Sequence, residues 1–152
     1  MRRHLWLASI PYGIVAIVSA VLGCIYLFRG RFMPYHAEAL GLEWADVEPD
    51  LQVLLTALMQ VAGAGWLALA VALGALLRWP FRGGALWARL TIPALIVTFY
   101  LPTFVATISV SLNTPATAPW YGNLASLIAA MIGVLLDFAL AHPANSPDPL
   151  SS

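Results

Sequence analysis

Charged residues are scarce in this sequence: they make up 9% of the 152 residues, and the seven basic residues are all arginine. A soluble domain usually carries about 25% charged residues. Hydrophobic residues make up 61% of the chain, which indicates an integral membrane protein rather than a soluble domain. The formal net charge of zero argues against nucleic-acid binding, because contacts with phosphates need a basic surface.

Cysteine and histidine are rare as well. The single cysteine, Cys24, excludes an intramolecular disulfide and the cysteine pairs of quinone-linked disulfide oxidoreductases. His4, His36 and His142 lie near the termini or in a loop, so no histidine is placed to ligate haem inside an apolar segment. No Ser/His or paired-Asp arrangement typical of an intramembrane protease is present. We therefore expect no cofactor and no metal, and enzymatic activity is disfavoured but left open.

Long apolar segments are what the sequence does contain. A helix rises about 1.5 Å per residue and needs about 20 apolar residues to cross a bilayer core of about 30 Å. Segments of this kind cover residues 5–28, 51–77, 90–112 and 120–141. The predicted fold is all-α: an integral membrane four-helix bundle in a single domain, residues 1–142. Helix number and size resemble those of small four-span bacterial inner-membrane proteins, including the DoxX-like group, and this resemblance assigns no functional residue.

The connections differ in composition. The longest, residues 29–50, holds five of the seven acidic residues, and we expect a short interfacial helix within it after Pro34. The last ten residues, 143–152, are polar and proline-rich and are predicted to be disordered.

Arginine distribution predicts the orientation. Four spans place both termini and the connection at 78–89 on one side, with Arg2, Arg3, Arg78, Arg82 and Arg89. The other side has only Arg29 and Arg31. Because cytoplasmic loops carry the excess of basic residues, we expect both termini and the 78–89 connection in the cytoplasm and the 29–50 connection outside.

The beginning of the chain has an alternative interpretation. Residues 21–24, VLGC, resemble a bacterial lipoprotein signal with Cys24 as the lipidated residue. Leu22 stands where a small residue is usual, and the apolar run of residues 5–28 is longer than the 7–15 residues of a signal peptide. A first membrane helix with an unmodified Cys24 is therefore the favoured interpretation.

Polar residues within the spans suggest candidate contacts. The third span is polar on two faces, so we expect it at the centre of the bundle with neighbours on both sides. A polar cluster at the outward end of the second, third and fourth spans is the candidate ligand site, either as an open cavity or as a closed hydrogen-bond network. Its members are Gln52, Thr56, Gln60, Tyr100, Thr103, Thr107, Asn123 and Ser126.

Charged groups supply two further candidates. Asp137 is the one acid within a predicted span, and Arg78, Arg82 and Arg89 are expected on the same side, so a structural ion pair or an interfacial position is predicted rather than a functional acid. His36 and Glu38 match no tight metal-ligand spacing, so a solvated loop is favoured over a metal site.

These features predict a small multi-pass protein of the inner membrane that acts as a non-enzymatic accessory or scaffold subunit. Its expected partners are the lipid bilayer and another membrane protein or a second copy of the chain. The alternative function is binding or transport of a small or lipidic ligand through the polar cluster.

Overall fold

The computed structural model describes residues 3–141, and every regular element in that range is helical. The elements are α1 (Arg3–Phe28), α2 (Pro34–Leu40), a 3₁₀ turn (Trp44–Asp46), α3 (Pro49–Leu76), a π-helical turn (Leu77–Phe81), α4 (Leu86–Asn113) and α5 (Trp120–Ala141). Four helices are long and apolar enough to cross a membrane. The prediction of an all-α chain is confirmed for this range, and each predicted apolar segment lies within one long helix. The tail expected at 143–152 lies outside the described residues.

Prolines and a glycine set the helix ends in the 29–50 segment. Pro34 begins α2 and Pro49 begins α3, at positions where the missing N–H of proline costs no helical hydrogen bond. Gly41 ends α2 with a φ of 65°, a left-handed conformation that glycine adopts without steric strain. A short helix is therefore present after Pro34, as expected; it is α2, and it ends at Leu40 because Gly41 terminates it.

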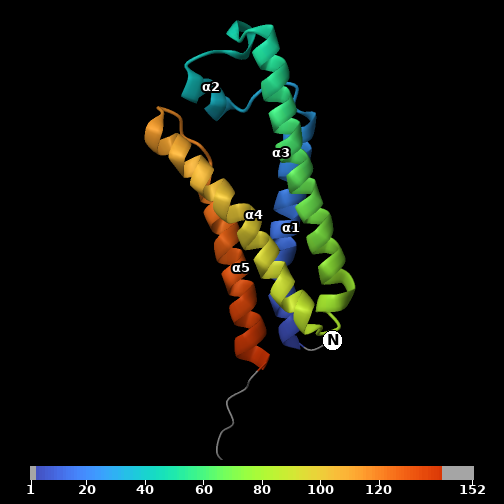
Figure 1. Cartoon of the computed structure of the whole chain (residues 1–152). Coiled ribbons are helices and arrows are strands. Elements are labelled where there is room, and N and C mark those ends of the chain that lie inside the picture. Colours follow the sequence, from blue (N-terminus) through green and yellow to red (C-terminus); the bar gives the residue numbers. More distant parts are fainter. Residues whose placement is uncertain (1–2, 142–152) are drawn as a thin grey trace, which may run out of the picture.

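The first helix forms the centre of the bundle. In Figure 1, α1 lies between α3 and α5 and packs along both of them, whereas α4 packs mainly along α5. The expectation that the third apolar segment would be central is wrong. Two of its hydroxyl groups donate within α4 itself: Thr103 donates to the Phe99 carbonyl at 2.6 Å, and Thr107 donates to the Thr103 carbonyl at 2.9 Å. These two donors therefore need no acceptor on a neighbouring helix.

Glycine allows two helix backbones to touch in the bundle. A Cβ atom on Gly63 of α3 would lie 2.6 Å from the backbone nitrogen of Leu27 and 2.9 Å from the carbonyl oxygen of Gly23, both in α1. The two backbones are thus in direct contact, as in small-residue packing motifs of membrane helices. This contact holds α3 against α1, and α3 and α4 move apart toward the end that carries α2 (Figure 1). We call that end, with residues 29–48 and 114–119, the loop end.

Candidate functional site

Interior polar groups are paired with one another. The hydroxyl groups of Ser19 in α1 and Tyr100 in α4 lie 2.9 Å apart, and Ser19 also donates to the Val15 carbonyl at 2.8 Å. Both side chains are fully buried. In α5, Asn123 Nδ2 donates to Thr107 Oγ1 of α4 at 3.0 Å. The candidate residues Tyr100, Thr107 and Asn123 therefore join helices through hydrogen bonds. Sequence reasoning missed Ser19, because a single serine in an apolar helix carries no periodic signal.

The candidate residues of α3 lie elsewhere. Gln52 Nε2 donates to the carbonyls of Trp44 at 2.8 Å and Val47 at 2.9 Å, so it anchors the 3₁₀ turn to α3. Gln60 is exposed, and with Gln52 and Thr56 it lines a hollow of about 510 Å³ to which α4 and α5 contribute no residue. The eight candidate residues thus do not form one cluster. Ser126 is buried in α5 and donates to the Gly122 carbonyl at 3.1 Å.

A buried ion pair lies at the end of the bundle opposite the loop end. Arg89 Nε donates to Asp137 Oδ2 at 2.7 Å, and the Asp137 side chain is 1% exposed. The guanidinium of Arg89 also lies 5.2 Å from the centre of the Phe138 ring. The other two candidate arginines are exposed: Arg78 stacks on Trp79 at 5.3 Å, and Arg82 has no carboxylate partner within the described range.

An apolar groove opens where α3 and α4 diverge. It has a volume of about 420 Å³ and lies under α2, between α3 and the end of α4. Tyr26, Leu55, Leu58, Met59 and Val110 line it, and α2 contributes His36, Ala39 and Leu40. A groove with this lining fits hydrocarbon chains or apolar side chains.

Hydrogen bonds of tyrosine and histidine side chains stabilise α2 and its position over this groove. The hydroxyl groups of Tyr26 and Tyr35 lie 2.9 Å apart, and burial raises the pKa of Tyr35 above its ordinary value. Met33 N donates to His36 Nδ1 at 3.3 Å, which requires that nitrogen to be unprotonated. Burial lowers the pKa of His36, so the neutral form that accepts this bond is favoured.

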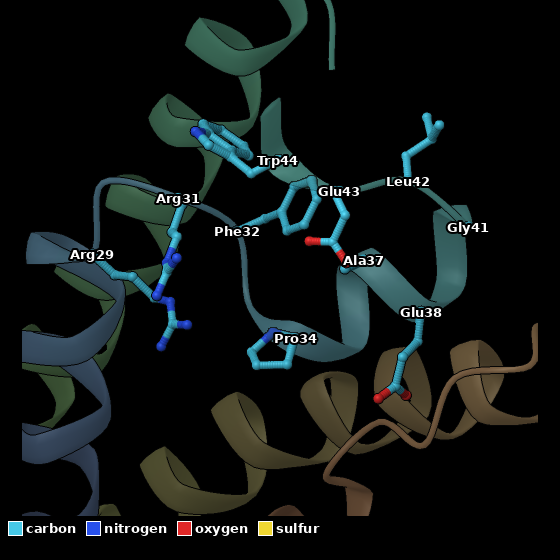
Figure 2. Close-up of a pocket in the computed structure, with 10 residues that line it drawn as sticks. All are labelled: Arg29, Arg31, Phe32, Pro34, Ala37, Glu38, Gly41, Leu42, Glu43 and Trp44. Atoms are coloured by element: carbon cyan, nitrogen blue, oxygen red, sulfur yellow. The ribbon is translucent and has the colours of Figure 1, made fainter. Parts of the chain in front are cut away.

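The opposite side of α2 faces a second, charged cavity. Figure 2 shows this cavity, of about 530 Å³, between the end of α1 and the segment that follows it through α2 to Trp44. Arg29 and Arg31 line it from one side, and Glu38 and Glu43 line it from the other. Glu38 Oε2 accepts the Thr117 N–H at 3.2 Å, a contact to the connection between α4 and α5. We call this space the arginine cavity; sequence reasoning used its two arginines for orientation and did not consider them as a site.

No cluster of metal-ligating side chains is present in the described part of the chain. Residues 3–141 contain no group of three or more His, Cys, Asp or Glu side chains arranged to hold a metal ion. The two cavities and the hollow beside Gln60 each have room for a ligand. No family model, curated protein or solved structure matches this chain.

Proposed function

We propose that this protein is a non-enzymatic accessory subunit of the bacterial inner membrane, inserted as a four-span bundle with both termini in the cytoplasm. The four long apolar helices support insertion. The excess of arginine at the end opposite the 29–50 connection supports the orientation. The loop end then lies at the outer surface.

One observation carries the subunit role. Along α3, Ala57, Ala64, Ala68 and Ala75 are all exposed. At about 100° per residue they fall within about 40° of one another, so they form one face, which we call the alanine face. Small side chains let a second membrane helix approach closely, in a solvent where apolar burial gives no net drive. The proposed partner is another membrane protein or a second copy of this chain.

Site-specific photocrosslinking in intact membranes tests this role. A photoreactive side chain at position 64 should give a covalent adduct, and its mass distinguishes a second copy from a different protein. The same group at position 125, an exposed alanine of α5, is the matched control and should react with lipid alone. Absence of a protein adduct at position 64, or equal adducts at both positions, would refute the proposal.

The apolar groove supports a second candidate, binding of a lipidic ligand. Its apolar lining and its opening between α3 and α4 favour hydrocarbon chains. Leu58→Trp should fill the groove and reduce the lipid that co-purifies in mild detergent. Leu54→Trp is the control, since Leu54 is similarly exposed on α3 and does not line the groove. Unchanged lipid in both variants would exclude this candidate.

A further inference from the structure

The arginine cavity holds two cations on one short segment. Arg29 and Arg31 follow α1 directly, and in Figure 2 both guanidinium groups extend from this segment toward the Pro34 side of the cavity. The one ion pair of the described residues joins Arg89 and Asp137, so neither arginine is neutralised by a carboxylate within that range. Two like charges facing one space repel each other, and an anion between them relieves the repulsion.

Guanidinium groups in this arrangement suit a phosphate. Arginine presents planar, forked N–H donors that match phosphate oxygens, and such charge-assisted bonds are stronger than neutral ones. Arg29 Nε is buried and has no acceptor among the described residues. Arg29 therefore has an N–H donor without a hydrogen-bond partner among the described residues, and it lines an accessible cavity.

The opposite wall has the complementary charge. Glu38 and Glu43 line the other side of the cavity, so its lining has two basic and two acidic residues on separate segments. Figure 2 shows the Glu43 carboxylate directed into the cavity, whereas the Glu38 carboxylate turns toward the connection between α4 and α5, where it accepts the Thr117 N–H. A purely anionic ligand would meet the carboxylates as well as the arginines. A zwitterion, with its phosphate and its ammonium joined by a short link, matches both walls.

Position in the fold points to a lipid headgroup. The cavity lies where the apolar run of α1 ends at Phe28 and before α3 begins at Pro49. In the proposed orientation this is the outer headgroup layer. Phe32 and Trp44 also line the cavity, with ring centres 4.9 Å apart, and aromatic rings of this kind favour that layer.

We propose that the arginine cavity binds the headgroup of a zwitterionic phospholipid, with the phosphate on Arg29 and Arg31 and a primary ammonium on the acidic side of the cavity, where the Glu43 carboxylate faces it. This inference rests on the membrane insertion proposed above and does not depend on the alanine face. Alkaline extraction of membranes reports insertion separately, so a failure of insertion and a failure of headgroup recognition are distinguishable.

Native mass spectrometry of the full chain released from detergent provides the test. The chain is titrated with phosphatidylethanolamine, with phosphatidylglycerol and with soluble phosphoethanolamine. We expect phosphatidylethanolamine to bind more tightly than phosphatidylglycerol, and Arg29→Gln/Arg31→Gln to weaken its binding about tenfold or more, as loss of charged hydrogen bonds predicts. Arg82→Gln, an exposed arginine at the other end of the bundle, is the control and should bind as the native chain does.

A second pair of substitutions tests the ammonium side. Glu38→Gln/Glu43→Gln should keep phospholipid binding and shift the preference toward phosphatidylglycerol, because an anionic headgroup is then no longer repelled by negatively charged side chains. This pair also serves as the test if the arginine variant misfolds. Equal binding by the native and the arginine variant, or a native preference for phosphatidylglycerol, would overturn the proposal. Soluble phosphoethanolamine binding as tightly as the lipid would overturn the assignment to a lipid.

Discussion

At the residue scale, two ionisable side chains of the described structure are removed from water: Asp137 is buried and His36 is half-buried. Asp137 is buried in α5 beside Arg89, and one of its oxygens, Oδ1, has no hydrogen-bond partner within the described range. His36 lies half-buried in α2 and accepts a backbone N–H. The burial of the Asp137–Arg89 pair and the hydrogen bond that His36 accepts each have a measurable consequence.

Removing Arg89 should destabilise the protein more than removing the charge of Asp137. Arg89→Gln leaves an uncompensated carboxylate with 1% exposure, and losing one partner of a buried pair costs about 3 kcal/mol or more. Asp137→Asn leaves an arginine whose side chain is 17% exposed and can reach water, so the loss should be smaller. Equilibrium unfolding in mixed micelles measures both, with Arg78→Gln as the control. An equal or reversed order would contradict the assigned burial.

Acidification should loosen α2 through His36. Because the folded-state pKa lies below the ordinary value of 6.5, the unfolded state binds more protons, and the stabilisation is present above about pH 6.5 and lost as the pH falls. Protonation also removes the acceptor for Met33 N–H. Hydrogen exchange of residues 33–41 should therefore accelerate between about pH 7 and pH 5 relative to the intrinsic rate.

A substitution separates this effect from other titrations. His36→Gln keeps a side-chain acceptor at the third helical position, as in a capping box, and does not titrate. Its exchange should show a much smaller change with pH. An identical pH response in the native chain and in this variant would show that another group is responsible.

At the scale of the elements, α3 lies close to α1 because glycine lets their backbones touch, and not because the contact buries a large hydrophobic area. Gly63→Ala should destabilise the protein by about 1–3 kcal/mol, since the added methyl meets backbone atoms of α1 that have no rotamer to change. Gly74→Ala in the same helix has no atom within 4 Å of the added Cβ and should be neutral or stabilising, by up to about 1 kcal/mol. Thermal unfolding in detergent measures both, and similar effects of the two would argue against the close approach of α1 and α3.

At the scale of the whole molecule, the arginine asymmetry predicts how the chain is inserted. Alkaline phosphatase fused after Ser152 should be inactive, and a fluorescent protein at the same position should fold, because both report a cytoplasmic C-terminus. The same reporters placed in the 29–48 segment should give the opposite result. An active phosphatase at the C-terminus would reverse the orientation, and with it the assignment of the arginine cavity to the outer surface.

Intact mass distinguishes the two interpretations of Cys24. This residue is exposed within α1, which continues without a break to Phe28. We expect the purified chain to retain its full mass of about 16.3 kDa with a free thiol. Loss of residues 1–23 together with a diacylglycerol adduct would establish a lipoprotein instead.

The sequence by itself determined that the chain is all-helical and where its long helices lie. Long apolar runs favour helices that are long enough to cross a bilayer, because in that solvent each peptide group must be hydrogen-bonded within its own segment. Prolines and Gly41 then mark the helix ends, because φ and the missing N–H are local properties. For these reasons the four apolar segments and the helix after Pro34 were predictable.

The tertiary structure decided which polar groups meet. Periodicity shows that Gln60 and Thr103 belong to polar faces, and it does not show whether those faces turn toward each other. Thr103 bonds within its own helix, and Gln60 faces outward, so the expected cluster is divided. The contact of Gly63 with the α1 backbone fixes the rotation of α3, and that rotation places the glutamines beside Trp44 instead of α4. The arginine cavity likewise depends on how α2 and the segments on either side of it fold beside the end of α1, which helix periodicity does not specify.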